Sequence, residues 1–253
     1  MKILGKNGYN ISYNEFIPKD CNIIIIAMHG FAGDKNSSCI KALEQKVKEM
    51  NIGLIKFDWP GHGESETDGF NLTIDNCLSD LETIISHVKN NYPKANLIAF
   101  STSFGGYLTL LYNYYHKNTF KYIILRSPAI KMYDVMTNAI LTTEKNNELK
   151  EKKYFNHGFK RNIKVTEEFI NQLHDTDLTN LYDNESLTNI SIIHGTKDDV
   201  APIDNSIEFV QKHNCSFYPI EGADHRYKKD GELDKVIEIT TNILDNIKPT
   251  DSH

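Results

Sequence analysis

Two hydrophobic patterns alternate along this chain. Short runs that are almost entirely apolar have the length of buried strands, and longer segments repeat apolar positions every three or four residues, as one face of a helix does. Each strand of a parallel pair needs a crossover to reach its neighbour, so this alternation is typical of βαβ units and a mostly parallel sheet. The expected fold class is therefore α/β. The apolar runs predict strands at residues 9–17, 22–28, 54–57, 96–101, 122–126, 191–194 and 216–220.

Polar caps and a proline mark where the intervening helices begin and end. Ser37 and Ser38 are suited to cap a helix that runs to about Met50, because a hydroxyl oxygen accepts an unpaired N–H of the first turn. Thr73 begins a second helix in the same way, and this helix ends before Pro93, since the residue preceding a proline disfavours the helical conformation. Further helices are predicted at residues 104–116, 206–212 and 232–247.

The regular alternation is interrupted between about residues 129 and 187. This stretch of about 58 residues separates two strands, whereas a crossover connection needs only about a dozen. We therefore expect one domain, residues 1–253, that carries a partly helical lid or cap at about 129–187, with Thr166 as the N-cap of a lid helix. Four aromatic residues of the segment are candidates to line an acyl or aromatic pocket, with packing inside the lid as the alternative: Tyr133, Tyr154, Phe155 and Phe159.

Charge and apolar content argue against several classes of partner. The chain has a formal net charge of −6 and a pI of about 5.9, so its field repels phosphate backbones and no nucleic-acid partner is expected. The longest apolar run, Ile23–Met28, is far shorter than the ~20 residues that cross a bilayer, so no membrane span is expected. The first residues contain no apolar stretch of signal-peptide length, which indicates a cytoplasmic protein. These features are compatible with a monomer or a homodimer.

The spacing of cysteine and histidine residues gives no sign of a metal or cofactor site. The 4 cysteines form no Cys-x-x-Cys pair, and a chain of 253 residues does not need disulfides to fold, so we expect reduced thiols. The 10 histidines include no His-Glu-x-x-His pattern. We therefore expect neither a metal nor a cofactor.

A serine stands at the point where a predicted strand meets a predicted helix. The run Ser101-Thr102-Ser103-Phe104-Gly105 has the form of a nucleophile elbow, a sharp turn that raises the hydroxyl of its middle residue above the sheet. Such a turn needs small residues two positions on either side of that serine. Gly105 meets this requirement, and Ser101 stands where the usual motif has glycine. Ser103 is therefore the candidate nucleophile, and an ordinary Ser/Gly-rich turn before a helix is the alternative.

A serine hydroxyl is a weak nucleophile at neutral pH and needs a neighbouring base that a third group orients. One known chain order is serine, acid, histidine, with each residue in a loop after a later strand. Asp198 and Asp199 follow the sixth predicted strand, and either is a candidate acid, the alternative being a carboxylate that only caps the next helix. His225 follows the last predicted strand and is the candidate base. Other histidines are expected to sit in turns and to make structural hydrogen bonds: His29, His62 and His194.

Acyl transfer also needs donors aimed at the oxygen that gains negative charge. Removing one such donor raises the activation free energy by about 2.7–4 kcal/mol. The glycine-containing run from His29 to Gly33 follows a buried strand, and a turn there can aim the amide of Phe31 into the site. The amide of Phe104, directly after the candidate nucleophile, is the second donor, and a plain turn is the alternative reading of the first.

Five segments in this order carry a family resemblance: residues 29–31 (HGF), 58–65 (DWPGHGES), the elbow at Ser103, 194–198 (HGTKD) and 222–225 (GADH). Together they resemble the α/β-hydrolase family, and more narrowly its bacterial carboxylesterases of the cinnamoyl (feruloyl) esterase type, over nearly the whole chain. The resemblance implies a mostly parallel central sheet with helices on both faces and a lid. It also implies Ser103 as nucleophile, Asp198 as acid, His225 as base, and the amides of Phe31 and Phe104 as the oxyanion hole.

The function expected from these features is that of a serine carboxylesterase. Such an enzyme hydrolyses a small-molecule ester through an acyl-enzyme intermediate and needs no cofactor. A thioesterase or a small-peptide hydrolase would use the same triad, and a non-catalytic binding protein on the same scaffold is a further alternative.

Overall fold

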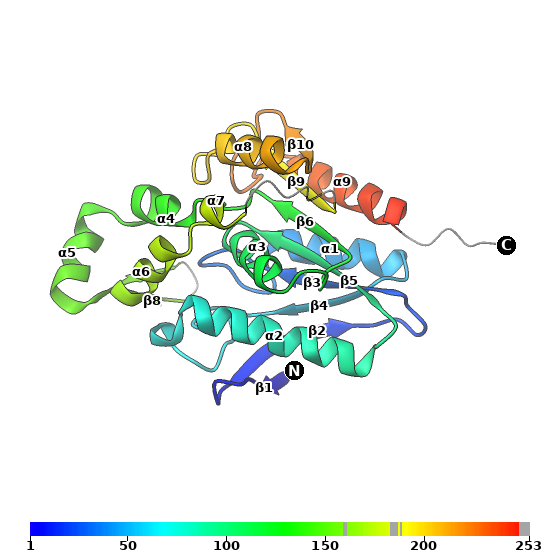
Figure 1. Cartoon of the computed structure of the whole chain (residues 1–253), viewed down its shortest axis with the longest axis horizontal. Coiled ribbons are helices and arrows are strands. Elements are labelled where there is room, and N and C mark those ends of the chain that lie inside the picture. Colours follow the sequence, from blue (N-terminus) through cyan, green and yellow to red (C-terminus); the bar gives the residue numbers. More distant parts are fainter. Residues whose placement is uncertain (159–160, 183–186, 188, 248–253) are drawn as a thin grey trace.

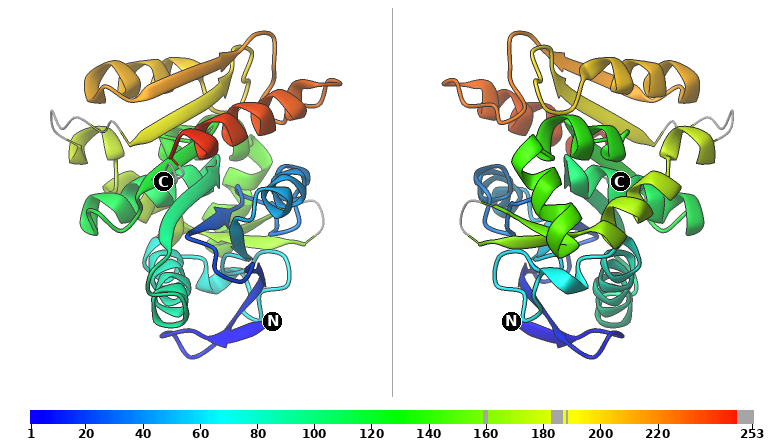
Figure 2. Two further views of the ribbon diagram at one scale, coloured as in Figure 1. Left: turned by 90° about the vertical axis from the view of Figure 1, so that its right-hand side faces the viewer. Right: turned by 90° about the vertical axis from the view of Figure 1, so that its left-hand side faces the viewer.

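An eight-stranded sheet runs through the middle of the protein, with helices on both of its faces (Figure 1, Figure 2). The structure, a computed structural model, describes residues 1–158, 161–182, 187 and 189–247. The strand order is β1-β2-β4-β3-β5-β6-β9-β10; β2 pairs antiparallel with β1 and β4, and the pairs from β4 to β10 are parallel. The predicted α/β class with a mostly parallel sheet is confirmed. The strands are β1 (Lys2–Leu4), β2 (Asn10–Phe16), β3 (Ile23–Met28), β4 (Gly53–Phe57), β5 (Asn96–Thr102), β6 (Tyr122–Arg126), β9 (Ile190–Gly195) and β10 (Ser216–Ile220).

Strand β3 shows why continuous apolar runs form the centre of this sheet. All 6 of its residues are buried. Successive side chains of a strand point to opposite faces, so a strand covered on both faces needs an apolar residue at every position. Ile24, Ile26 and Met28 belong to the core on one face, and Ile23, Ile25 and Ala27 belong to the core on the other.

The two cores are closed by different helices. On one face α1 (Ser38–Glu49) packs beside α9 (Glu232–Ile247). The other face is covered by α2 (Ile74–Asn91), α3 (Phe104–Tyr115) and α8 (Ile203–His213). These helices lie where the 3.6-residue pattern predicts them, although α8 starts three residues earlier than the predicted 206–212. Thr73 caps α2, since its hydroxyl oxygen accepts a hydrogen bond from the Asn76 N–H at 3.1 Å.

The segment between β6 and β9 lies beyond the ends of the parallel strands, at the left of Figure 1. Thr166 caps one of its helices, as predicted, by accepting a hydrogen bond from the Phe169 N–H at 3.1 Å. Residue 159, one of the four predicted aromatic pocket residues, falls outside the described residues. The elements of the segment are α4 (Met132–Val135), a π turn (Met136–Ile140), α5 (Thr143–Lys152), β7 (Tyr154–His157), β8 (Ile163–Thr166), α6 (Glu167–Asp175) and α7 (Leu178–Leu181).

Two features of the fold were not predicted from the sequence. Strands β7 and β8 form a separate antiparallel pair, with Phe155 opposite Val165, in a segment that was expected to be partly helical and for which no strand was predicted. Each of these strands has 4 residues, too few for a clear alternation of apolar and polar positions. Strand β1 has 3 residues at the sheet edge and only one that is not exposed, so its hydrophobic pattern carries no signal.

A buried carboxyl links α2 to the turn between β1 and β2, and it predicts a pH-dependent stability. Asp80 accepts a hydrogen bond from the Tyr9 hydroxyl at 3.2 Å, and its other oxygen, Oδ1, has no hydrogen-bond partner within the described part of the chain. Burial raises the pKa of this carboxyl to about 7, above its usual value of about 3.9. A raised carboxyl pKa in the folded state means that stability falls as the pH rises from about 4 to about 7.

Replacing Asp80 with asparagine removes this titration. We therefore expect the melting temperature of Asp80→Asn, minus that of the wild type, to increase between pH 5 and pH 8. Thermal denaturation of both proteins in matched buffers measures this difference in melting temperature. Tyr9→Phe, which keeps the carboxyl, should retain the wild-type fall with pH. An Asp80→Asn difference that is the same at both pH values would contradict the prediction.

Candidate active site

Ser103 lies between β5 and α3 in a backbone conformation that few L-residues adopt. Its φ is 50° and its ψ is −115°, as expected for a tight strand-to-helix turn that lifts the side chain above the sheet. The turn is closely packed, because a Cβ added at Gly105 would lie 2.7 Å from the carbonyl oxygen of His29. A Cβ added at Gly30 would lie 3.2 Å from the Cβ of Ser103. Glycine at these positions lets the loop after β3 pass directly beside Ser103.

Ser101 departs from the usual elbow motif, and the structure shows how its side chain is accommodated. The residue is fully buried, and its hydroxyl is 2.6 Å from the hydroxyl oxygen of Thr109 on α3. A buried hydroxyl costs free energy unless it is hydrogen-bonded, and this contact satisfies it. The extra atoms relative to glycine therefore fit between β5 and α3 without disturbing the turn.

The three residues predicted as a triad lie in contact in series. The Nε2 of His225, in the loop after β10, is 3.1 Å from the hydroxyl oxygen of Ser103. Its Nδ1 is 2.7 Å from Oδ2 of Asp198, in the loop after β9. An ionised carboxylate only accepts, so the imidazole donates from Nδ1 and Nε2 is left to accept the serine proton. The structure brings Asp198 to the histidine and leaves Asp199 exposed at the surface.

The carboxylate of Asp198 is held as an anion. Its Oδ1 accepts hydrogen bonds from the N–H groups of Val200 at 3.0 Å and Ala201 at 2.8 Å. Burial alone would raise the pKa of this side chain, but hydrogen bonds from His194, His225 and the backbone outweigh it and hold the pKa far below the usual range. Asp198 therefore stays charged at neutral pH, and it can orient and stabilise a protonated imidazole.

His194 touches this site although sequence reasoning placed it in a turn. It lies in strand β9, fully buried, so the predicted location is wrong while the structural hydrogen bonds are present. Its Nδ1 is 2.9 Å from the hydroxyl oxygen of Ser206, and its Nε2 is 3.1 Å from Oδ2 of Asp198. No local pattern signals this contact, and the contact makes His194 a positioning residue for the acid.

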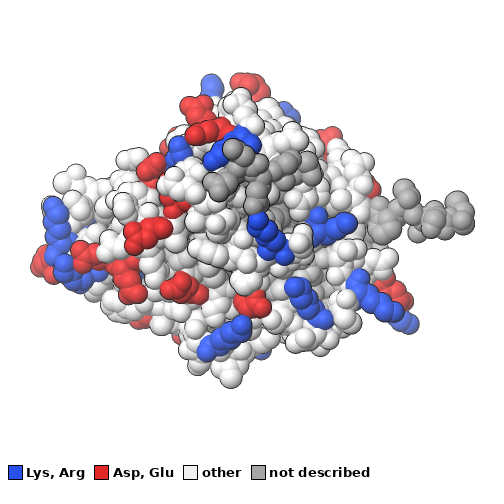
Figure 3. Space-filling view, in the orientation of Figure 1, with Lys and Arg blue, Asp and Glu red and all other residues white. Residues whose placement is uncertain are grey.

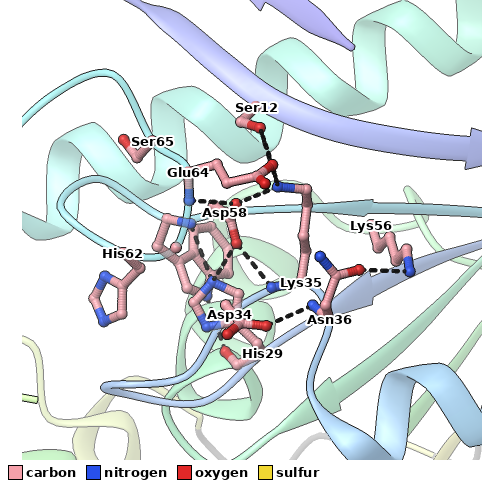
Figure 4. A network of polar contacts seen from close by, with 12 residues as sticks. Ser12, His29, Asp34, Lys35, Asn36, Lys56, Asp58, His62, Glu64 and Ser65 are labelled. Atoms are coloured by element: carbon pink, nitrogen blue, oxygen red, sulfur yellow. Dashed lines mark hydrogen bonds and ion pairs between the residues drawn. The ribbon is translucent and has the colours of Figure 1, made fainter. Parts of the chain in front are cut away.

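A network of polar groups around the buried Lys35 and Asp58 side chains fixes the loop that follows β3 (Figure 4). The Lys35 ammonium donates to Oδ2 of Asp58 at 2.5 Å, to Glu64 at 2.6 Å and to the Ser12 hydroxyl at 3.0 Å. The Lys35 N–H donates to Oδ1 of Asp58 at 2.8 Å. Burial by itself lowers the pKa of the Lys35 ammonium, but its two carboxylate partners raise it, so the lysine stays charged. The loop carrying Phe31 is thereby tied to β2 and to the turn after β4.

His29 anchors the first residues of the same loop. It is completely buried, its Nδ1 donates to the carbonyl oxygen of Gly30 at 2.8 Å, and its Nε2 accepts from the Trp59 N–H at 3.2 Å. Burial lowers the pKa of this imidazole, which keeps it in the neutral form that these two bonds require. His29 therefore has the structural role predicted for it.

The ring of Phe31 joins the loop to the segment between β6 and β9. It packs edge-on against Phe104 with ring centroids 5.7 Å apart. It also stacks on His157 of β7 at 5.6 Å and on Phe169 of α6 at 6.2 Å. Burial and the nearby charges of Lys145 and Arg226 lower the pKa of His157 to about 4, so this imidazole is neutral at physiological pH.

A pocket of about 280 Å³ opens directly onto Ser103 and His225. Its walls are the loop after β3, the start of α1, the end of β6 and the His225 loop with the beginning of α9. Larger hollows of about 360 Å³ and 500 Å³ contain neither Ser103 nor His225. Three aromatic residues predicted as pocket candidates do not line the pocket at Ser103; they are Tyr133, Tyr154 and Phe155.

Each of these aromatic side chains packs against a neighbouring side chain away from the pocket at Ser103. Phe155 is completely buried beneath the Lys145 ammonium, whose nitrogen lies 5.6 Å from the ring centroid. The ring of Tyr154 packs against Phe70 with centroids 5.2 Å apart, and that of Tyr133 packs against His174 at 5.0 Å. The alternative stated from the sequence, packing within the segment, therefore describes Tyr133 and Phe155, whereas Tyr154 packs against Phe70, outside the segment.

Among the residues described, no three His, Cys, Asp or Glu side chains are placed to hold a metal ion. Within the described ranges, no helix is both long enough and apolar enough to cross a membrane. On the face shown in Figure 3, basic and acidic side chains are mixed and do not form one continuous basic surface.

The sequence from residue 20 to residue 190 matches the family described as serine aminopeptidase, S33. This range is well over half of the chain and includes the elbow at Ser103. The chain belongs to this family. It is therefore a hydrolase. Asp198 and His225 lie beyond the matched range, so their assignment depends on the geometry described above.

Solved structures similar to this hydrolase share its fold at low sequence identity. Est1E from Butyrivibrio proteoclasticus with bound ferulic acid has a TM-score of 0.83 at 20% identity, covering 97% of this chain and 98% of its own. α/β hydrolase domain-containing protein 10 from mouse has a TM-score of 0.75 at 17% identity, with 98% and 99% covered. A monoacylglycerol lipase from Paleococcus ferrophilus has a TM-score of 0.68 at 14% identity, with 92% and 98% covered. The fold of this hydrolase is that of the α/β hydrolases, as the sequence resemblance implies.

Proposed function

We propose that this hydrolase is a serine carboxylesterase that cleaves a small-molecule ester, with Ser103 as nucleophile, His225 as general base and Asp198 as the acid. The observation that carries the proposal is the unbroken contact series from the Ser103 hydroxyl through the imidazole to the Asp198 carboxylate, next to a pocket of about 280 Å³. Nucleophile, base and orienting group in hydrogen-bond contact are what an activated serine requires.

In the first step the Ser103 oxygen attacks the carbonyl carbon while Nε2 of His225 takes the hydroxyl proton. The tetrahedral intermediate places a negative charge on the former carbonyl oxygen. The amides of Phe31 and Phe104 are the proposed donors to this oxyanion, since Gly30 passes beside Ser103 and the first N–H groups of α3 have no acceptor within the helix. The intermediate collapses when the C–O bond to the alcohol breaks and the imidazolium returns its proton to the leaving oxygen.

The second step releases the acid. Water loses a proton to the same imidazole as its oxygen attacks the acyl carbon, and the Ser103 oxygen leaves with the proton that His225 returns. Asp198 stays ionised throughout and stabilises the imidazolium in both steps. No cofactor takes part in this reaction. We further propose that residues 129–187 act as a lid over the site, because Phe31 packs against two aromatic rings of that segment.

Support for ester hydrolysis also comes from the similar structures. Est1E binds ferulic acid, a carboxylic acid of the kind that ester cleavage releases. The family description favours a second candidate, a small-peptide hydrolase, because it names an aminopeptidase. An oxygen ester, a thioester and an aminoacyl amide with comparable acyl groups, compared by kcat/KM, separate these reactions. The highest value is expected for the oxygen ester, and a higher value for the amide would favour the peptidase.

Covalent labelling tests the nucleophile directly. We expect a fluorophosphonate probe to modify the native protein at one serine, and mass spectrometry of its peptides to locate the adduct on Ser103. The reaction depends on the folded triad, so protein denatured before labelling should not react. An adduct on another serine, or native protein that does not react, would overturn the assignment.

A further inference from the structure

The pocket at Ser103 is lined by two arginines, Arg126 and Arg226, and by no acidic side chain among the described residues. This is unusual for a chain whose net charge is −6, because acidic side chains outnumber basic ones overall. Arg226 directly follows His225, and Arg126 is the last residue of β6. The catalytic reaction described above uses neither guanidinium. Their joint presence beside the nucleophile therefore needs another explanation.

Arg126 is held in the pocket wall with part of its hydrogen-bonding capacity unused. Only 9% of the residue is exposed. Its Nη2 donates to the backbone oxygen of His225 at 2.6 Å, and its guanidinium carbon lies 4.4 Å from the ring centroid of Tyr227. Its Nε is buried and has no hydrogen-bond partner in the described part of the molecule. A buried charged donor without an acceptor is costly, and such a group in a binding pocket is readily explained by a ligand.

The start of helix α1 also lines this pocket. The first N–H groups of a helix lack acceptors within it and carry partial positive charge. In this helix of 12 residues, the N-cap Ser37 makes no side-chain capping bond and no acidic residue occupies the first turn. The hydroxyl oxygen of Ser37 is buried and finds no hydrogen-bond partner among the residues described. Ser37, Ser38 and Cys39 all line the pocket.

The guanidinium of Arg126 and the start of α1 line the same pocket of about 280 Å³. Burial raises the pKa of the Cys39 thiol, in the first turn of α1, and the charge of Arg126 partly offsets the increase. Helix N-termini and arginines are the two groups that proteins most often use to bind carboxylates and phosphates. Here both converge on a pocket that also contains the Ser103 hydroxyl.

We infer that the ester hydrolysed at Ser103 carries an anionic group, a carboxylate or a phosphate, which binds between Arg126 and the first turn of α1. Arg226 adds positive charge at the pocket rim, and the Ser37 hydroxyl donates to the same anion. This inference rests on the proposed esterase function and specifies its substrate class. It makes Arg126 a specificity residue as well as a support for the His225 loop.

Two matched ester pairs test the inference. The first compares monomethyl succinate with methyl succinamate, which replaces the carboxylate by an amide of almost the same shape. The second compares 2-acetoxyethyl phosphate with its dimethyl phosphate ester. Each kcat/KM is divided by the rate of hydroxide hydrolysis, because the charge also changes intrinsic reactivity. At low ionic strength we expect the anionic member of at least one pair to be preferred by about 10- to 100-fold, the size of a charge-assisted hydrogen bond. The pair that shows the preference identifies the anion.

Substitution of Arg126 distinguishes a role in binding the anion from a role in supporting the His225 loop. In Arg126→Met, the ratio of corrected kcat/KM between the anionic ester and its neutral partner should fall to about 1. A residue that only supports His225 would instead lower kcat/KM for both esters equally and leave this ratio unchanged. Arg126→Lys should restore part of the ratio. Arg226→Gln should reduce the ratio and remains informative if Arg126→Met does not fold. Lys131→Met, which removes a positive charge outside this pocket, is the matched control and should leave the ratio intact.

A binding measurement covers the case in which none of these esters is turned over. Succinate and inorganic phosphate are each added before the fluorophosphonate probe, and at least one should slow the labelling of wild-type Ser103 but not of Arg126→Met. If the serine is labelled, yet neither ion protects it and neither ester pair shows a preference, the anion site is wrong and the esterase proposal stands. A protein that does not react with the probe would instead refute the proposed function.

Discussion

Replacing Ser103 with alanine is expected to lower kcat/KM for ester hydrolysis by about 10⁶-fold, the scale on which serine hydrolases lose activity without their nucleophile. The substitution removes only the oxygen that lies 3.1 Å from the His225 imidazole, so no acyl-enzyme can form. Both Ser and Ala have a Cβ, and the turn should therefore keep its geometry. Initial rates with an aryl ester, together with thermal denaturation of both proteins, measure the effect and verify the fold.

Ser101→Ala is the matched control for this experiment. Its hydroxyl lies in the same turn but is hydrogen-bonded to Thr109, away from the imidazole. Activity is expected to stay within about tenfold of the wild type, since the loss of one buried hydrogen bond costs about 1 kcal/mol. Ester hydrolysis that survives in Ser103→Ala would show that another group is the nucleophile.

Replacing Asp198 with asparagine should lower kcat by about 10⁴-fold, the loss measured when a triad aspartate is made neutral in another serine hydrolase. The amide no longer favours the imidazole tautomer whose Nε2 accepts the serine proton. It also no longer stabilises the imidazolium. Asparagine keeps an oxygen that can accept the N–H groups of Val200 and Ala201, so the loop should be retained. Steady-state kinetics at saturating ester give the change in kcat.

Asp199→Asn separates the two neighbouring carboxylates that the sequence left open. Asp199 is exposed and is not the carboxylate in contact with His225, so its neutral variant should keep kcat close to the wild-type value. The opposite result, an inactive Asp199→Asn beside an active Asp198→Asn, would move the acid role to Asp199. Thermal denaturation of both variants distinguishes a catalytic loss from unfolding.

The sheet and the triad were accessible to sequence reasoning because each depends on strong local signals. Strands such as β3 are covered on both faces and therefore consist of continuous apolar residues. Loops that follow parallel strands meet at one edge of the sheet, so chain order predicted that Ser103, His225 and an acid at residue 198 or 199 come together, and the family resemblance singled out Asp198. The contacts span 122 and 27 residues. Apolar periodicity predicted both α1 and α2, and the predicted cap is present at Thr73 of α2, whereas Ser37 at the start of α1 makes no side-chain capping bond.

The residues that sequence reasoning missed act through contacts that no local pattern encodes. Arg126 ends an apolar strand and resembles an ordinary polar boundary, but its aromatic partner Tyr227 is supplied by a loop about 100 residues later. His194 belongs to the same apolar strand that precedes Asp198, and only the fold shows that its ring faces that carboxylate. Strands β7 and β8 are too short to produce an alternation, and their pairing depends on tertiary packing.

The double role of Phe31 connects substrate access to the chemistry. Its backbone N–H is a proposed oxyanion donor, while its ring stacks on His157 and on Phe169 of the segment proposed above as a lid. A movement of that segment large enough to admit a substrate must change what the ring rests on. The Phe31 N–H would then reach its position as oxyanion donor only once the proposed lid has closed again. Attack on the carbonyl would therefore follow closure, in a site shielded from bulk water.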